Sequence, residues 1–186
     1  MPKPRIVPVA TPAREAAEFL AKAPTLDGRP LNIFGTLAHH PLLLRRYLAL
    51  GSVFLTFNLL PPREREIVIL RVAWRAGSVY EFGQHTRVGR GVGLSEEEIA
   101  RAARPPLDGW TEPDAVLVRM VDELQTADIV SGPTWAALAR RWSEPELLEL
   151  LALAGFYRMT AGLLNSAGIE AEPGVPGWPP GTAPGR

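Results

Sequence analysis

The sequence of 186 residues contains no cysteine. A chain without a thiol cannot form a disulfide, a thiolate metal ligand or a redox-active pair of sulfur atoms, so these chemistries are excluded. The absence of cysteine also fits a reducing compartment, and we expect a cytoplasmic location.

A charge imbalance is lacking as well, because 20 basic and 20 acidic residues give a formal net charge of +0. Proteins that bind nucleic acids or anionic membranes usually carry a basic surface. The longest apolar stretches are interrupted before the ~20 residues that a membrane span needs, and the basic start of the chain lacks the apolar region of a secretory signal. We therefore expect no nucleic-acid partner, no membrane and no export.

Histidine is scarce, with three residues in the chain. His39 and His40 are adjacent, so on a helix their side chains diverge by about 100° and cannot face one ion together. His85 and Glu81 would supply two metal ligands with no evident third. We expect neither a metal nor a cofactor.

Alternating apolar and polar runs long enough to build a sheet are missing, whereas helical spacing is common. The sequence therefore predicts an all-α fold. Its length and its 46% hydrophobic residues suit one domain over 1–186, with a core at about 12–168. Residues 1–11 and 169–186 are rich in proline and glycine and predict irregular arms. Trp178 in the second arm either packs on a surface, such as a neighbouring subunit, or lies in a solvated tail.

Start and stop residues place the predicted helices along the chain. Thr11 is the expected N-cap of the first helix, and Gly77 separates two helices that carry most of the reactive side chains. Residues 54–60 are ambiguous between helix and loop. The expected helices cover about 12–22, 32–38, 41–50, 62–76, 79–92, 96–103, 112–127, 134–141 and 143–165.

The residues best suited to chemistry lie on the two helices around Gly77. Ser78, Glu81 and His85 are three and four positions apart and share one helical face, which Glu66 or Arg71 of the preceding helix can approach. An imidazole exchanges protons near neutral pH, and a neighbouring carboxylate orients it. The pattern predicts cofactor-free proton transfer in a pocket walled by aromatic side chains. The expected wall residues are Phe54, Phe57, Trp74, Tyr80 and Phe82.

Each of these residues also has an ordinary structural explanation. Glu81 follows Ser78 by three positions and can complete a capping box. The charged run at 63–66 can be a solvated first turn of a helix, with its acids near the positive end of the helix dipole. His85 can be a hydrogen-bonded residue of the core. Spacing alone leaves these alternatives open.

Three segments carry a resemblance to a known family: LPPREREIVILR at 60–71, YEFGQH at 80–85 and GLSEEEI at 93–99. They resemble the carboxymuconolactone decarboxylase family, which includes relatives of the alkyl hydroperoxidase AhpD, and GFYRMTAGLLN at 155–165 is similar to the last helix of that family. The resemblance implies an AhpD-like helical fold and a homo-oligomer, which we expect to be a dimer, trimer or hexamer.

In the peroxidase branch of this family, a Cys-x-x-Cys pair precedes the motif histidine. Its positions correspond here to Ser78 and Glu81, so a thiol peroxidase mechanism is excluded. The resemblance implies catalytic roles for Glu66 and His85, with Tyr80, Glu81 and Arg71 as accompanying residues. The predicted catalytic set is thus His85, Glu66, Glu81 and Tyr80, and the predicted substrate-binding set is Arg71, Trp74, Phe54, Phe82 and Gln84.

The sequence predicts a cofactor-independent lyase or isomerase that acts on a small organic acid or lactone. Arg71 is the expected partner of a substrate carboxylate, since a guanidinium group matches the two carboxylate oxygens. A non-catalytic oligomeric protein that binds a small molecule in the same pocket is the alternative. Peroxide reduction without a thiol is a third possibility, although no side chain supplies the two electrons it needs.

Overall fold

The computed structural model describes residues 4–105 and 109–184, which fold into nine α-helices and one short hairpin of two strands. The all-α fold class predicted from the sequence is confirmed. The elements are α1 (Arg14–Leu20), β1 (Thr25–Leu26), β2 (Arg29–Pro30), α2 (Asn32–Leu37), α3 (Pro41–Leu55), α4 (Pro62–Arg75), α5 (Val79–Gly91), α6 (Glu96–Ala102), α7 (Glu112–Ala127), α8 (Gly132–Leu138) and α9 (Glu144–Ala167).

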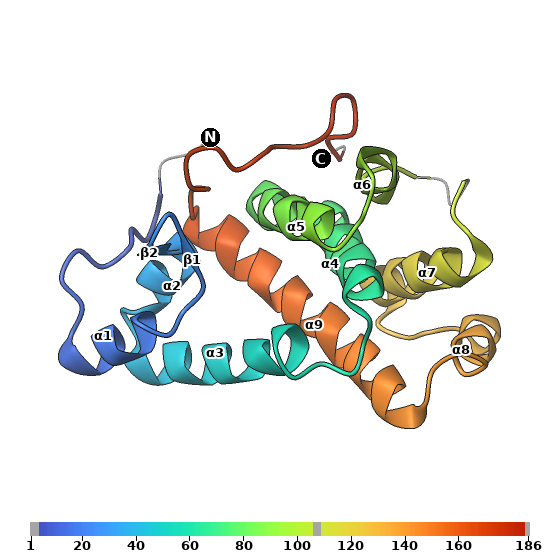
Figure 1. Ribbon diagram of the computed structural model, residues 1–186, viewed down its shortest axis with the longest axis horizontal. Coiled ribbons are helices and arrows are strands. Elements are labelled where there is room, and N and C mark those ends of the chain that lie inside the picture. The colour runs from blue at the N-terminus through green and yellow to red at the C-terminus, as the bar shows by residue number, and fades with distance from the viewer. Residues whose placement is uncertain (1–3, 106–108, 185–186) are drawn as a thin grey trace.

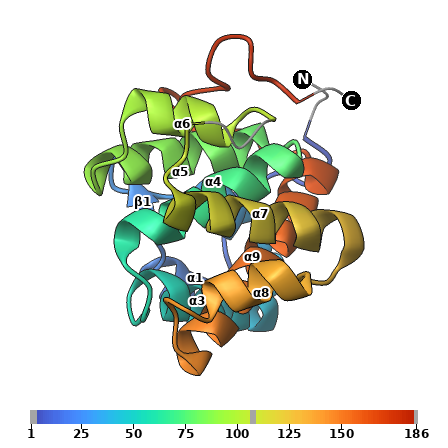
Figure 2. The same ribbon diagram turned by 90° about the vertical axis from the view of Figure 1, so that its right-hand side faces the viewer.

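Helices α4 and α9 form the centre of the molecule. α4 packs against α5, α6, α7 and α9, and α3 packs against α1, α2 and α9. Figure 1 shows α9 crossing the molecule obliquely, with α3 on one side of it and α4 and α5 on the other. The view in Figure 2 shows α7 and α8 on the face next to α4 and α9. The two helices that carry the predicted catalytic residues, α4 and α5, are therefore neighbours in the core.

The helix ends follow the local signals in the sequence. Complete capping boxes begin α6, with Ser95 and Glu98, and α9, with Ser143 and Glu146. Gly77 has a φ of 63° between α4 and α5, which is a left-handed conformation that glycine adopts without strain. The chain can therefore turn sharply between these two helices and fold them against each other.

Three local predictions differ from the structure. The N-cap of α1 is Ala13 and not Thr11, so this helix is shorter than expected. Helix α3 continues through Gly51 to Leu55, because Gly51 faces the ring of Phe156 and packing outweighs the low helix propensity of glycine. The hairpin was not predicted, because each strand has two residues.

The turn of this hairpin explains why so short a ladder forms. Thr25 pairs with Pro30 and Leu26 pairs with Arg29. The two residues between the strands, Asp27 and Gly28, have φ values of 51° and 76°. An Asp-Gly pair with positive φ at both positions is favoured in tight hairpins, because its twist matches that of the strands.

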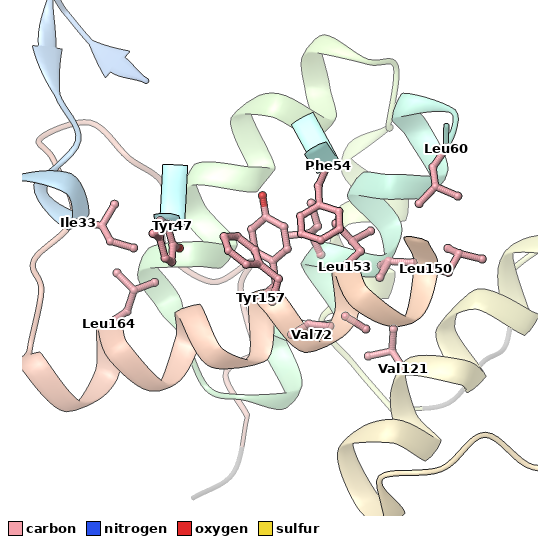
Figure 3. Packing of buried hydrophobic residues seen from close by; sticks show 14 of the residues in the cluster. Ile33, Tyr47, Phe54, Leu60, Val72, Val121, Leu150, Leu153, Tyr157 and Leu164 are labelled. Carbon is pink, nitrogen blue, oxygen red and sulfur yellow. The ribbon is translucent and has the colours of Figure 1, made fainter. Parts of the chain in front are cut away.

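The main hydrophobic cluster lies between α3, α4, α7 and α9. Figure 3 shows its side chains, among them Phe54 from α3, Val72 from α4 and Leu150 from α9. Helix α9 is long and apolar enough to cross a membrane by length and composition, but half of its most apolar window is buried inside the protein. The central helix of a soluble helical core has the same properties.

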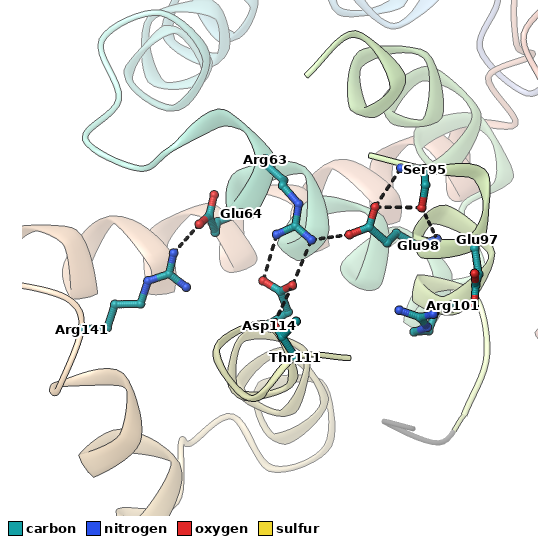
Figure 4. Close-up of polar contacts among 9 residues, drawn as sticks. All are labelled: Arg63, Glu64, Ser95, Glu97, Glu98, Arg101, Thr111, Asp114 and Arg141. Atoms are coloured by element: carbon teal, nitrogen blue, oxygen red, sulfur yellow. Dashed lines mark hydrogen bonds and ion pairs between the residues drawn. The ribbon is translucent and has the colours of Figure 1, made fainter. Parts of the chain in front are cut away.

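Charged side chains at the beginning of α4 are paired with neighbouring helices. Arg63 forms a bidentate ion pair with Asp114 of α7, at 3.0 and 2.9 Å, and also contacts Glu98 of α6 (Figure 4). Glu64 pairs with Arg141. Hydrogen bonding to Asp114 raises the pKa of Arg63 above its ordinary value. The structure therefore contradicts a solvated first turn and shows that these charges join α4 to three other segments.

The C-terminal arm leads from the end of α9 across α5 towards α6 (Figure 1). Trp178 packs on Phe82 of the same chain, with ring centroids 4.9 Å apart. This residue therefore packs on a surface and does not lie in a solvated tail. At the other end, the backbone amides of Arg5 and Ile6 donate to the carbonyl of Ala167. The extreme ends of both predicted arms, 1–3 and 185–186, lie outside the described residues.

Candidate active site

A cavity of about 480 Å³ lies between α3, α5, α9 and the segment that contains the hairpin. A volume of this size suits a small molecule. Four predicted site residues line it, namely Tyr80, Glu81, Gln84 and His85. Most of the remaining lining is apolar or aromatic, with Ile33, Phe34, Tyr47, Leu48, Leu55, Val88, Phe156, Tyr157 and Leu164.

A short polar contact beside the cavity joins His85 to Glu66. The His85 Nδ1 atom lies 2.6 Å from Glu66 Oε2, and the Glu66 side chain is completely buried. The Nε atom of Arg65 donates to the other oxygen of Glu66 at 2.9 Å. The carboxylate is thus held from both sides, and the Nε2 atom is the nitrogen of His85 that remains for a ligand. His85 is hydrogen-bonded, as the structural explanation expected, but its side chain is 12% exposed and lines the cavity.

Tyr157 of α9 completes the surroundings of the histidine ring. Its ring meets His85 edge-on, with centroids 4.8 Å apart and an interplanar angle of 87°. Burial raises the pKa of Tyr157 well above its ordinary value, and the negative charge of Glu66 adds to this effect. The phenol therefore stays neutral. Tyr157 was not among the predicted site residues, although it lies in the motif of the last helix.

Glu81 lies one helical turn before His85 and is the least satisfied polar group of the site. It is 2% exposed, and neither carboxyl oxygen has a hydrogen-bond partner among the described residues. Burial raises its pKa well above the ordinary value, which favours a neutral carboxylic acid. Ser78 makes no capping bond through its hydroxyl. The capping-box explanation of Glu81 is therefore wrong.

Tyr80 and Gln84 are held by a residue of the C-terminal arm. The Tyr80 hydroxyl donates to Glu172 Oε1 at 2.9 Å, and the Gln84 side-chain amide donates to Glu172 Oε2. The backbone amide of Asn32 also donates to Glu172, at 2.6 Å. Burial, with the negative charge of Glu172, raises the pKa of Tyr80 above its ordinary value. Glu172 had no signal in the sequence, because it lies in an irregular segment.

Arg71 and Trp74 do not line the cavity, which corrects their placement at the substrate. Arg71 forms a bidentate pair with Asp122 of α7, at 2.8 and 2.6 Å, and donates to the carbonyls of Ala102 and Arg104. Its guanidinium carbon lies 4.5 Å from the ring centre of Trp74, whose Nε1 donates to the carbonyl of Thr182. Arg71 therefore connects α4 with α7 and the end of α6.

The aromatic residues that line the cavity also differ from the predicted ones. Phe54 is in the core, with its ring centroid 5.3 Å from that of Phe156, and Phe82 is covered by Trp178. Phe57 is 74% exposed. Of the five expected aromatic residues, Tyr80 lines the cavity, and the other four do not. The aromatic wall consists instead of Phe34, Tyr47, Tyr80, Phe156 and Tyr157.

Residues 4–105 and 109–184 contain no group of three histidine, aspartate or glutamate side chains arranged to hold a metal ion. The polar side chains around the cavity are groups that can exchange protons. A histidine paired with a buried carboxylate, a neutral carboxylic acid and a neutral phenol lie around one small cavity.

The fold is that of AhpD-like proteins. The chain superposes on an uncharacterized peroxidase-related protein with an AhpD core from Ralstonia eutropha JMP134, with a TM-score of 0.80 and 18% identity over 93% of this chain and 94% of that one. An uncharacterized peroxidase-related protein from Silicibacter sp. TM1040 gives 0.79 and 14%, over 96% and 98%. A cysteine-to-alanine variant of the debrominase Bmp8, in complex with 2,3,4-tribromopyrrole, gives 0.67 and 15%, over 86% and 83%.

A sequence comparison supports the family resemblance. Residues 41–108 match the sequence model of the Carboxymuconolactone decarboxylase family, so the resemblance found in the motifs is confirmed for this segment. Comparison with curated protein sequences gives no match. The chain therefore has an AhpD-like fold, lacks cysteine and matches this family over residues 41–108.

Proposed function

We propose that this protein is a cofactor-independent enzyme that moves a proton on a small molecule bound in the cavity, with His85 as the base and acid. The observation that supports this function best is the 2.6 Å contact between His85 Nδ1 and the buried Glu66. It fixes the ring at the wall of the cavity and leaves Nε2 as the reactive nitrogen.

Glu66 acts on the reaction through His85. As a buried carboxylate it orients the ring and stabilises the imidazolium that forms when Nε2 takes a proton. Arg65 keeps the carboxylate in position from the opposite side, at 2.9 Å. A positioned acid or base contributes roughly 10²- to 10⁴-fold to a reaction rate. The His85 side chain is 12% exposed and lies between the apolar lining and the Tyr157 ring.

The reaction class that the geometry supports best is an isomerisation. Neutral His85 takes a proton from one carbon of the substrate, the electron pair moves into an enolate, and the imidazolium returns the proton to another carbon. A decarboxylation would also end with a proton delivered by His85, after the bond to the carboxyl carbon breaks and carbon dioxide leaves. It is the weaker candidate, because Arg71, the expected carboxylate partner, is engaged with Asp122.

The test is hydrogen exchange in deuterium oxide. Enolisable cyclic ketones and lactones are incubated with the protein, and mass spectrometry measures deuterium incorporation next to the carbonyl. We expect exchange with the wild type and a loss of at least about 100-fold in His85→Gln. Glu66→Gln is expected to lower the rate as well. His39→Gln is the matched control, because His39 contacts the Val7 carbonyl away from the cavity.

An unchanged rate in His85→Gln would remove this residue from the mechanism. If a small molecule binds tightly and no compound exchanges, the protein is a binding protein that retains an AhpD-like pocket. Equal rates of deuterium exchange in the Glu66→Gln and wild-type proteins would show that the buried carboxylate only stabilises the fold. These outcomes separate the enzyme from its non-catalytic alternative.

We also propose that the protein is a homo-oligomer, in line with the expectation from the sequence. Large apolar side chains of α3 and the loop after it are exposed, with Phe57 at 74%. Large apolar side chains that stay exposed on a helix and the loop after it fit a subunit interface. Light scattering measures the mass in solution, and a monomer at all concentrations would contradict the proposal. The exposed side chains are Leu42, Leu43, Leu50, Val53, Leu55, Phe57 and Leu59.

A further inference from the structure

Most polar side chains that line the cavity already have partners within the protein. The Tyr47 hydroxyl bonds to Thr160 at 2.6 Å, and the Ser52 hydroxyl donates to the carbonyl of Ala49. Tyr80 and Gln84 donate to Glu172. These groups hold the wall of the cavity together, and a ligand that recruited them would first have to break an existing hydrogen bond.

Glu81 is different, because both of its carboxyl oxygens lack a partner among the described residues although the side chain is buried. A buried polar group without a hydrogen bond is costly, by about 1 to 3 kcal/mol, so natural proteins rarely keep one without a use. Glu81 lines the cavity one turn from His85. Residues four apart on a helix have Cβ atoms about 5 to 6 Å apart, so one small ligand can reach both side chains.

Positive charge is scarce at this cavity. Among the described residues that line it, the one lysine or arginine is Lys22, which is exposed on the hairpin side. Arg65 is paired with Glu66, and Arg71 is paired with Asp122. A carboxylate buried without a paired cation is strongly disfavoured. The lining therefore selects against ligands that carry a negative charge.

We propose that the cavity binds a neutral ring compound whose carbonyl oxygen accepts a hydrogen bond from the Glu81 carboxylic acid, with the neighbouring carbon facing His85. This proposal rests on the proposed proton transfer and names its substrate class. His85 Nε2 breaks the C–H bond next to the carbonyl, and the electron pair moves onto the carbonyl oxygen. The hydrogen bond from Glu81 stabilises that oxygen, and the imidazolium later returns the proton to carbon. No electrons enter or leave the system.

The ligand class is tested with a pair of compounds that differ in one charge. α-Tetralone is neutral and enolisable, and a second α-tetralone carries a carboxylate on its benzene ring. Titration calorimetry with the wild-type protein measures both dissociation constants at the same pH. We expect the carboxylate to bind at least about tenfold more weakly, because its charge has no buried partner. Equal or tighter binding of the carboxylate overturns the proposal.

The role of Glu81 is tested with two variants. Glu81→Gln keeps a neutral hydrogen-bond donor of similar shape, and Glu81→Met removes the donor. We expect α-tetralone to bind the Gln variant about as well as the wild type and the Met variant about fivefold more weakly, which is the loss of one hydrogen bond. Equal binding to the Met variant and the wild type overturns the proposal.

The pH dependence gives a readout that a purely structural role would not change. Deprotonated Glu81 cannot donate, so wild-type binding of α-tetralone falls as the pH rises through the raised pKa of this group. The Gln variant should lack this fall. The groups that face Glu81 from other helices are Tyr47 on α3 and Tyr157 on α9, with His85 on its own helix. Because these remain in the variant, the difference between the two profiles belongs to Glu81.

The proposal and the proposed function can fail separately. If α-tetralone binds through Glu81 but no deuterium enters the carbon next to the carbonyl, the ligand class holds and the enzymatic function fails. If the carboxylated compound exchanges deuterium in a reaction that requires His85, the function holds and the ligand class fails. Exchange in the wild type that is retained in Glu81→Gln and lost in Glu81→Met and His85→Gln supports both.

Discussion

Gly83→Ala is the sharpest structural test of the C-terminal arm, because a methyl group at this position meets backbone. A Cβ atom on Gly83 would lie 2.1 Å from the carbonyl oxygen of Pro176 and 2.7 Å from the Val175 side chain. The carbonyl belongs to the chain that crosses α5 and cannot rotate away like a flexible side chain. The arm must therefore move off α5 at this point.

The expected cost follows from the contacts that such a movement breaks. The Trp178 ring leaves Phe82, at about 1 kcal/mol. The hydrogen bond from Trp74 to Thr182 and the one from Tyr80 to Glu172 are weakened, at about 1 kcal/mol each. Alanine instead of glycine within a helix returns about 1 kcal/mol. The free energy of unfolding should fall by about 2 kcal/mol.

Gly155→Ala is the matched control, since Gly155 is also helical and no heavy atom lies within 4 Å of its added Cβ. Its free energy of unfolding should rise by up to about 1 kcal/mol. Urea denaturation measures both variants, and hydrogen exchange reports on the amides at 170–184. If Gly83→Ala is as stable as Gly155→Ala and the arm keeps its protection, the arm does not pack on α5 as described.

Three further changes test the charged groups. Glu81→Gln should be more stable than the wild type by an amount that increases as the pH rises above about 4.5. The reason is that the pKa of the wild-type carboxyl is raised in the folded protein, so the wild type loses stability between the pKa of the unfolded state and that of the folded state. Urea denaturation at several pH values measures the difference, which grows by about 1.4 kcal/mol per pH unit until the pKa of the folded state is reached. Arg71→Met should destabilise the fold by about 2 kcal/mol, since it leaves the Ala102 and Arg104 carbonyls without this donor and leaves Asp122 with only the longer contact to Arg75, at 3.5 Å. Binding of α-tetralone should stay unchanged, and weaker binding would restore the predicted role of Arg71 at the substrate. Glu172→Gln should lower the pKa of Tyr80 towards its ordinary value, because the negative charge of Glu172 helps to raise it. An ultraviolet titration of the phenol detects this change. An unchanged titration would show that the contact between Tyr80 and Glu172 is not formed in solution.

The fold could be predicted from the sequence where local signals are strong. Capping boxes, the break at Gly77 and the family motifs placed most helices within a few residues, because these signals depend on neighbouring atoms. Gly51 misled the prediction of α3, since the helix continues where this glycine faces the Phe156 ring of α9. Such a tertiary contact has no counterpart in the local pattern.

The centre of the site was predictable for the same reason, and its periphery was not. Glu81 and His85 share a face by helical spacing, and Glu66 reaches His85 after the turn between α4 and α5. Arg71 is five residues after Glu66, which places it about 140° around the same helix and directs it to α7. The spacing alone therefore argues against Arg71 as a partner of the same ligand. Glu172 comes to the site through an arm without regular structure.

The positions that correspond by resemblance to the cysteines of the peroxidase branch bear directly on the proposed chemistry. Ser78 and Glu81 occupy them at the beginning of α5, and both are buried with oxygen atoms that have no partner among the described residues. A thiol pair at this place would exchange electrons with a peroxide. A carboxylic acid exchanges protons instead, and burial keeps it protonated. Because the Glu66 and His85 pair can also carry a proton, a carboxylic acid at position 81 fits the proposed function better than any exchange of electrons.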